Sequence, residues 1–263
     1  HAFTNGTLID EKFCQDMKRV GNFSVAISLE GFNEVNDLRR GKGVFDKVMH
    51  AMDLMKQYGL IFGTSICYTS KNYKVVTSDE FLDMIIEKGA RFSWYFHYMP
   101  VGNEASCELL PDPDQREYMY HRIREIRAMK GGKPIFAFDF QNDGEYVGGC
   151  IAGGRNYCHI NPNGDVEPCV FIHYSGANIK EVDLLTALKQ PLFMAYRCWR
   201  IRRSYSAWYM KQKLIPPTYS HRNPWSICVG NVRSMQKNGT CVHRSCGRRI
   251  GIINNSSFTK VYI

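Results

Sequence analysis

The stretch GGCIAGGRNYCHINPNGDVEPC, from Gly148 to Cys169, places Cys150, Cys158 and Cys169 within twenty residues. Asn163-Gly164 stands between two short β-prone segments and predicts a hairpin whose turn brings Cys158 and Cys169 towards each other. Cys150 arrives from a glycine-rich loop, in which the backbone can approach a cofactor closely and offer N–H groups to sulfide. Because thiolates on converging segments are what an iron-sulfur cluster requires, the stretch predicts such a site.

Zinc is the main alternative ligand for these thiols. Zinc usually takes cysteine pairs two to four residues apart, whereas seven and ten residues separate these three cysteines, so we favour a cluster over a structural zinc site or a chance group of thiols. Cys14, Cys67 and Cys107 are interpreted as small buried hydrophobes.

Ten cysteines, no signal-peptide pattern and no run of about 18 apolar residues predict a cytoplasmic protein without a membrane partner.

Outside this stretch the sequence alternates between short apolar runs and helical stripes, which is typical of a parallel sheet wrapped by crossover helices. Strands are expected at residues 24–29, 60–67, 92–98 and 134–138. Helices are expected between Gly31 and Gly59, from a capping box of Thr77 and Glu80 to Gly89, and from Asp112-Pro113 to Gly131. Periodicity leaves open whether the sheet is doubly wound or a section of a (β/α) barrel.

The formal charge of +9 is concentrated at one end of the chain. Residues 1–196 hold all 25 Asp and Glu and 21 of the 34 Lys and Arg, whereas residues 197–263 hold the other 13 cations and no acid. A basic tail with three of the four tryptophans would suit nucleic acid, since cations neutralise phosphates and aromatic rings stack on bases. The abrupt loss of acids inside a helical segment fits a wrong reading frame after residue 196 better, so no nucleic-acid partner is expected.

The spacing Cys150, thirteen residues, Gly164, four residues and Cys169 resembles Cys-x(9–15)-Gly-x4-Cys, the opening signature of the SPASM and twitch extensions of radical S-adenosylmethionine (SAM) enzymes. The body agrees with this resemblance. Residues 3–6, 27–31, 60–72 and 96–102 are similar to the third, fourth, fifth and sixth barrel strands of that superfamily. The resemblance covers about residues 3–197.

The resemblance implies an α/β fold, the C-terminal part of a partial (β/α)6 barrel followed by a small Cys-rich SPASM- or twitch-like extension. Residues 1–147 would form the barrel part, 148–197 the auxiliary-cluster segment, and 198–263 a basic tail of doubtful structure. In such enzymes one electron from a 4Fe-4S cluster cleaves SAM to a 5′-deoxyadenosyl radical. An electron donor such as flavodoxin or ferredoxin is therefore implied as a partner, and the substrate is unknown.

The resemblance also implies site residues. Those expected to bind SAM are Asn5, Ser28, Glu30, Asn72 and Tyr98, and those expected to bind an auxiliary 4Fe-4S cluster are Cys150, Cys158, Cys169 and Cys198. The predicted positions of Ser28, Glu30 and Tyr98 at strand ends agree with this, because barrel enzymes assemble their sites at the C-terminal ends of strands. The structural alternatives are a turn at Asn5-Gly6, a loop entry at Glu30 and a satisfied core histidine at His97.

The chain departs from the family pattern at two points. It contains neither the Cys-x3-Cys-x2-Cys motif that holds the radical-generating cluster nor the Gly-Gly-Glu-type motif that binds the SAM amino group. Both motifs precede the third strand in the family, so we expect an N-terminally truncated fragment that does not cleave SAM alone. The leading hypothesis is thus a radical SAM enzyme of oxidoreductase type, with a nucleic-acid-binding protein and a zinc-stabilised domain as alternatives.

Overall fold

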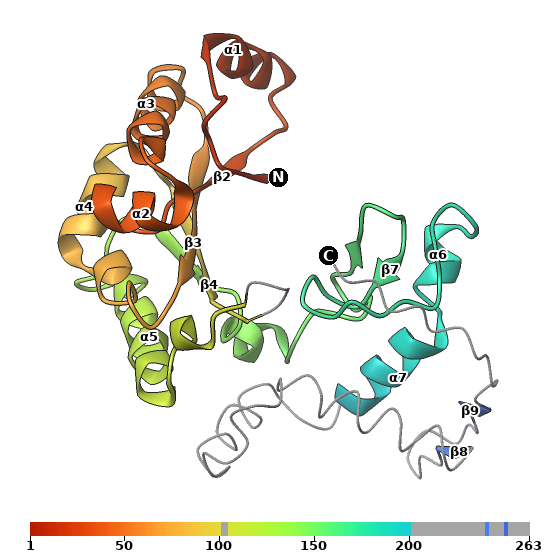
Figure 1. The fold of residues 1–263 in the computed structure, drawn as a ribbon. Helices are drawn as coiled ribbons and strands as arrows, with labels where there is room; N and C mark the ends of the chain where they lie inside the picture. The colour runs from red at the N-terminus through yellow and green to blue at the C-terminus, as the bar shows by residue number, and fades with distance from the viewer. Residues whose placement is uncertain (101–104, 201–239, 242–249, 252–263) are drawn as a thin grey trace. The chain divides into compact units, whose positions relative to one another are not determined.

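A computed structural model of the protein describes residues 1–100, 105–200, 240–241 and 250–251. The chain divides into two compact units, of which the first comprises residues 1–100 and 105–143 and the second begins at Gly144 (Figure 1). Most of the basic tail lies outside the described residues, and so do Cys228 and Cys246.

The first unit is built on one parallel sheet. Its strands are β1 (Ala2–Thr4), β2 (Val25–Ser28), β3 (Phe62–Tyr68), β4 (Phe92–His97) and β5 (Phe136–Asp139). They lie in sequential order, and each pairs in parallel with the next. Because a doubly wound sheet reverses its strand order at a switch point, this order confirms the section of a (β/α) barrel.

Helices connect the strands of this sheet. They are α1 (Glu11–Val20), α2 (Asn33–Arg40), α3 (Val44–Gln57), α4 (Asp79–Glu87) and α5 (Pro113–Ile126), with short 3-10 turns η1 (Val75–Thr77) and η2 (Cys107–Leu109). Two helices, α2 and α3, replace the single helix expected before Gly59. The break between them is fixed by Asp37, whose carboxylate accepts hydrogen bonds from the backbone N–H groups of Gly43 and Phe45.

The helix starts agree with the sequence except at α4. Helix α5 begins with a full capping box between Asp112 and Gln115. Helix α4 is capped by Ser78, which accepts from the N–H of Phe81 at 3.2 Å. The predicted cap at Thr77 is therefore wrong, because the Thr77 hydroxyl lies in η1 and donates to the carbonyl of Tyr73 at 2.8 Å.

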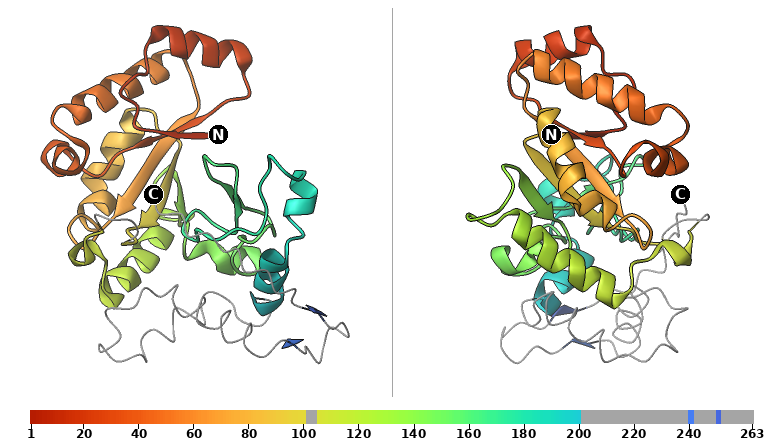
Figure 2. Two further views of the ribbon diagram at one scale, coloured as in Figure 1. Left: turned by 45° about the vertical axis from the view of Figure 1, so that its right-hand side comes forward. Right: turned by 90° about the vertical axis from the view of Figure 1, so that its left-hand side faces the viewer.

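One face of the sheet is covered by helices, and Figure 2 shows them gathered on that side. The apolar core there joins buried side chains of α1, α3, α4 and α5 to the sheet residues Val25, Ile27, Phe62, Ile66, Tyr68, Tyr95 and Ala137. The alternate residues of β4 and β5 carry aromatic rings on the other face, where Trp94 stacks on Phe138 with ring centroids 4.6 Å apart. The sheet therefore has one face packed by helices and one face lined by aromatic rings.

The second unit is small and rich in turns. It contains η3 (Asp143–Val147), the hairpin β6 (His159–Ile160) and β7 (Val166–Glu167), α6 (Leu184–Ala187), α7 (Pro191–Arg200), and the pair β8 (Thr240–Cys241) and β9 (Ile250–Gly251). Its buried apolar cluster consists of Val166, Ala187 and Phe193. Gln190 fixes β7 to this cluster by donating to the carbonyl of Val166 at 2.9 Å. In the part of the chain that the structure describes, no helix is long and apolar enough to span a membrane.

The buried carboxyl group of Asp139, at the end of β5, predicts a pH-dependent stability. Burial raises its pKa to about 7, the Asp143 carboxylate adds to the effect, and Asn142 and Arg124 oppose it. Since the folded state keeps this proton while the unfolded state loses it near pH 4, Asp139 lowers the free energy of unfolding as pH rises from about 4 to about 7, by up to roughly 4 kcal/mol.

We expect Asp139→Asn to remove this contribution, because the neutral amide keeps the shape and does not titrate. The measurement is urea unfolding, followed by circular dichroism, at several pH values between 4 and 7.5. The exposed Asp16→Asn substitution serves as the control. If the wild-type protein and Asp139→Asn lose stability in parallel across this range, the assignment to Asp139 is wrong.

Candidate functional site

A buried ion-pair cluster stands at the C-terminal edge of the sheet. Glu30 follows β2 and is only 1% exposed. Its Oε2 lies 2.8 Å from Nη1 of Arg39, and its Oε1 accepts from Nε of Arg40 at 3.1 Å. Both arginines come from the last turn of α2, where cations also interact favourably with the helix dipole. The Glu30 carboxylate is therefore already neutralised by two guanidinium groups.

Asn72 joins the ends of β2 and β3. Its Nδ2 donates to the carbonyls of Glu30 at 2.9 Å and Cys67 at 3.3 Å, and its Oδ1 accepts from the N–H of Thr69 at 2.7 Å. The side chain is 4% exposed, so both ends of the amide are used within the fold. The structure thus brings Asn72 to Glu30, as the sequence predicts, but as a brace between loops.

Two serine hydroxyl groups lie beside the Glu30 ion-pair cluster. Ser28 at the end of β2 pairs in register with Ser65 of β3, and both side chains are half-buried. Within the described residues neither hydroxyl has a hydrogen-bond partner. Ser28, Ser65 and Cys67 alternate with the core residues of their strands and therefore lie on the face without helices. Arg39 also reaches Cys67, since it forms a hydrogen bond to that thiol.

Asn5, Tyr98 and His97 also lie at this edge, and they differ in their burial and hydrogen bonds. Asn5 is exposed and its Oδ1 accepts from the N–H of Thr7 at 3.1 Å, which is the turn that the sequence allowed. The hydroxyl oxygen of Tyr98 accepts from the N–H of Ser106 at 2.9 Å. His97 points to the helix-covered face, where burial and the nearby Arg116 lower its pKa to about 3. His97 is therefore a neutral core residue.

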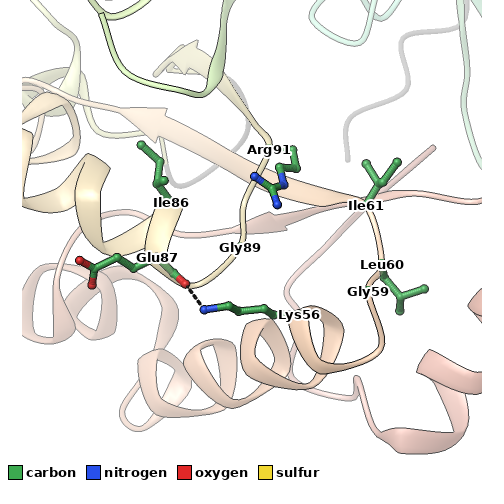
Figure 3. A pocket seen from close by; sticks show the side chains of 8 residues that line it. All are labelled: Lys56, Gly59, Leu60, Ile61, Ile86, Glu87, Gly89 and Arg91. Atoms are coloured by element: carbon green, nitrogen blue, oxygen red, sulfur yellow. Dashed lines mark hydrogen bonds between the residues drawn. The ribbon is translucent and has the colours of Figure 1, made fainter.

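Arg39 and Arg40 were not identified from the sequence. The available signal was two adjacent cations in the last turn of a helix, nine and ten residues after a strand-end glutamate. A cavity of about 440 Å³ lies elsewhere, at the opposite edge, where β3 and β4 begin (Figure 3). Its wall is fixed by Lys56, which donates to the carbonyl of Glu87 at 2.6 Å. It does not belong to the strand-end site.

In the second unit, Arg155 holds the loop that carries Cys150. Its Nη1 donates to the carbonyls of Gly148 and Gly149 at 3.2 Å and of Cys150 at 3.3 Å, and its Nη2 donates to that of Val147. Gly148 and Gly149 have positive φ angles, of 69° and 104°, which L side chains rarely adopt. A single guanidinium group therefore fixes the backbone on which Cys150 stands.

Cys169 lies in a pocket of backbone donors. Burial raises the pKa of its thiol, while the N–H groups of Phe171 and Val170 bond to the sulfur and oppose this rise. Tyr157 stands close by, because its hydroxyl oxygen accepts from the N–H of Val170 at 3.2 Å and the Cys169 thiol helps burial to raise its pKa to about 12. Backbone N–H groups aimed at sulfur are what a cluster thiolate uses.

Cys158 differs from this expectation. The hairpin forms as predicted, but its register pairs His159 with Glu167 and Ile160 with Val166. Since side chains alternate across a strand, Cys158 falls on the same face as Val166, where it packs against the apolar cluster. A turn that brings two strands together therefore does not by itself place Cys158 and Cys169 on one face.

The positions of Cys150 and Cys169 fit an iron-sulfur cluster better than a single metal ion. Among the side chains that the structure describes, no three from His, Cys, Asp or Glu converge closely enough to hold one metal ion. The thiolates of a 4Fe-4S cluster bind different irons and stand farther apart than the ligands of one ion. Cys150 on its clamped glycine loop and Cys169 among its N–H donors suit such a cluster. Cys198 belongs to α7, but its side chain lies outside the described residues.

Two family models match the chain, one on each unit. The radical SAM superfamily matches residues 1–86, and an iron-sulfur cluster-binding domain, SPASM, matches residues 150–212. The first match covers β1 to β3 with the Ser28 and Glu30 positions, and the second begins at Cys150. These matches support neither the nucleic-acid-binding nor the zinc-stabilised alternative.

Curated relatives agree with both matches. An AdoMet-dependent heme synthase of Oleidesulfovibrio alaskensis is 25% identical over 203 residues, which cover 67% of this chain and 51% of the relative. The mycofactocin maturase MftC of Mycolicibacterium smegmatis is 31% identical over 179 residues, covering 64% of this chain and 44% of the relative. The chain therefore spans about half the length of the curated relatives it matches.

Solved structures show the same fold. SuiB of Streptococcus suis superposes with a TM-score of 0.62 at 18% identity, covering 76% of this chain and 51% of that one. The structure of anSMEcpe with bound AdoMet and the Cp18Cys peptide gives a TM-score of 0.57 at 21% identity, covering 74% and 58%. A parallel barrel section with a cysteine hairpin after it defines a radical SAM fold with an extension. Residues 1–86 thus match the radical SAM superfamily, and residues 150–212 match the SPASM iron-sulfur cluster-binding domain.

Proposed function

We propose that this chain forms part of a radical SAM enzyme of oxidoreductase type, in which the first unit contributes to the SAM site and the second binds an auxiliary 4Fe-4S cluster. The observation that carries the proposal is the signature Cys150, Gly164 and Cys169 on a hairpin, in a chain that also has a parallel barrel section. When bound, SAM and a reduced 4Fe-4S cluster supply a 5′-deoxyadenosyl radical for chemistry on an organic substrate.

The contacts of each strand-end residue suggest its role in holding SAM. Ser28 has an open hydroxyl on the face without helices, so it is suited to hydrogen-bond the ribose or the amino-acid end of SAM. Glu30 and Asn72 have their polar atoms engaged by Arg39, Arg40 and the loop backbone. We therefore assign Glu30 and Asn72 the role of positioning the edge of the site.

Asn5 and Tyr98 complete the predicted SAM site. Asn5 is exposed at the end of β1, and Tyr98 directly follows β4, so both stand at the same C-terminal edge as Ser28. Each has a polar atom that already accepts one backbone hydrogen bond, and a carbonyl or hydroxyl oxygen can accept a second. We propose that they line the cleft around the cofactor.

For the auxiliary cluster we propose ligands from the second unit. Cys150 and Cys169 are the two signature cysteines, and Cys198 is the nearest later cysteine. Arg155 keeps the Cys150 loop in place, and the N–H groups of Val170 and Phe171 stabilise negative charge on the Cys169 sulfur. Cys158 stands against the apolar cluster of the hairpin, which sets it apart from the signature pair.

The proposal also covers SAM cleavage, the electron donor and the cellular compartment. Because it contains no Cys-x3-Cys-x2-Cys motif, we propose that residues 1–263 alone do not cleave SAM. A one-electron donor of the flavodoxin or ferredoxin kind would reduce the complete enzyme. The six cysteines whose side chains are described are all free thiols, which supports a reducing compartment such as the cytoplasm.

Anaerobic reconstitution with iron and sulfide tests the proposed function. We expect about four irons per chain and visible iron-sulfide absorption. We also expect SAM to bind in equilibrium dialysis, more weakly to Ser28→Ala than to the wild-type chain, and dithionite to release no 5′-deoxyadenosine. Uptake of zinc with no iron-sulfide absorption would contradict the proposal and support a zinc-stabilised domain.

A further inference from the structure

A buried carboxylate on the hairpin binds two imidazole rings. Glu167 of β7 is 3% exposed, and its Oε2 lies 2.7 Å from Nδ1 of His159 and 3.3 Å from Nδ1 of His173. Its Oε1 accepts from Nδ2 of Asn161 at 3.0 Å. This buried carboxylate therefore orients three side chains that surround it.

This arrangement fixes which nitrogen of each ring is available. A carboxylate accepts hydrogen bonds, so each Nδ1 that faces Glu167 carries the proton, and Nε2 of the neutral ring keeps its lone pair. Within the described residues, neither Nε2 atom has a hydrogen bond, and the two side chains are 29% and 42% exposed.

The position of this group relates it to the cluster site. His159 and Glu167 are register partners and so share one face of the hairpin, the face opposite to Cys158 and Val166. Cys169 follows Glu167 by two residues and forms a β-bridge with Ile172, the residue before His173. The two imidazoles therefore stand on the segments next to Cys169.

We propose that Glu167 positions His159 and His173 so that one of their Nε2 atoms binds an iron of the auxiliary cluster beside Cys169. Histidines that bind metals generally donate their other ring N–H to a carboxylate or carbonyl, as both do here. Imidazole replaces thiolate in some iron-sulfur centres, where it raises the reduction potential. Such a ligand would also fill a place that Cys158 leaves vacant, since that thiol packs in the apolar cluster.

This inference rests on the proposed function, and its test separates the two. The full chain is reconstituted anaerobically, reduced with dithionite and measured by pulsed electron paramagnetic resonance. We expect a strongly coupled nitrogen that changes from ¹⁴N to ¹⁵N when the protein contains ¹⁵N-histidine. The coupling should disappear in either His159→Ala or His173→Ala, and added imidazole should restore it. His50→Ala, at an exposed position of α3, is the control that keeps it.

The outcomes distinguish failure of the histidine ligand from failure of the cluster itself. A cluster without a strongly coupled histidine nitrogen overturns this inference and leaves the proposed function standing. A histidine coupling that survives in both single variants also overturns it, because the nitrogen then comes from another residue. Failure of the wild-type chain to form any cluster overturns the proposed function together with the inference. Glu167→Gln, which keeps the side-chain volume, is expected to weaken the coupling without removing the iron.

Discussion

Replacing Cys169 with alanine is expected to abolish the auxiliary cluster, whereas Cys158→Ala leaves it in place. Cys169 provides a signature thiol, and backbone N–H groups beside it favour its thiolate, so we expect its removal to prevent cluster binding. Cys158 contacts the apolar cluster around Val166 and Phe193, and its loss should cost folding stability on the order of 1 kcal/mol. Iron should fall from about four atoms per chain to fewer than about one in Cys169→Ala alone.

The measurement is the iron and sulfide content after anaerobic reconstitution, with circular dichroism of the metal-free proteins to confirm that each variant folds. Cys14→Ala is the matched control, since Cys14 is a fully buried thiol of α1 in the first unit. If Cys158→Ala loses as much iron as Cys169→Ala, Cys158 is a ligand and the hairpin must rearrange when the cluster binds.

The sequence predicts the hairpin that carries Cys158 and Cys169 but not the face that each cysteine occupies. Asn163-Gly164 correctly predicts the hairpin, because turn chemistry is local. Which face a cysteine occupies depends on the register, and a shift of one residue moves every side chain to the other face. The register follows from the loop length. A two-residue turn at Asn163-Gly164 would pair Cys158 with Cys169, whereas the observed register pairs Ile160 with Val166 and is shifted by one residue.

The barrel section shows the same limit at a larger scale. Apolar runs and helical stripes correctly predict β2 to β5 and the helices α3, α4 and α5, because burial imposes a period on each element, whereas α1 is not predicted. Their arrangement was left open between two folds, and only the sequential strand order excludes a doubly wound sheet. At α4, Thr77 and Ser78 are both competent caps, and the turn η1 decides between them by occupying the Thr77 hydroxyl.

At the strand ends, the sequence predicts which residues gather but not what they contact. Ser28, Glu30 and Asn72 do lie at one edge of the sheet, because the ends of parallel strands meet there. The sequence does not reveal that Arg39 and Arg40 come back onto Glu30, since this contact depends on how α2 packs. It also does not reveal that the Asn72 amide forms its hydrogen bonds with backbone groups.

Glu30→Gln is expected to lower the free energy of unfolding by about 3 kcal/mol, because it leaves Arg39 and Arg40 without a counter-charge. The estimate is at the low end of the range for buried pairs, since the two side chains remain 36% and 27% exposed. Urea unfolding followed by circular dichroism measures it. Asp16→Asn is the control, because Asp16 pairs with exposed cations and its replacement should leave the stability nearly unchanged.

A double-mutant cycle then separates the charge from the packing of the glutamate side chain. If the unpaired cation is the cause, Arg40→Gln should recover part of the lost stability in the Glu30→Gln background, although it destabilises the wild-type protein. SAM binding should fall in Glu30→Gln and remain unchanged in Asp16→Asn, because Glu30, unlike Asp16, holds the two arginines at the strand ends. A Glu30→Gln protein as stable as the wild type would show that the two arginines find solvent or other partners, and that Glu30 does not organise this edge of the sheet.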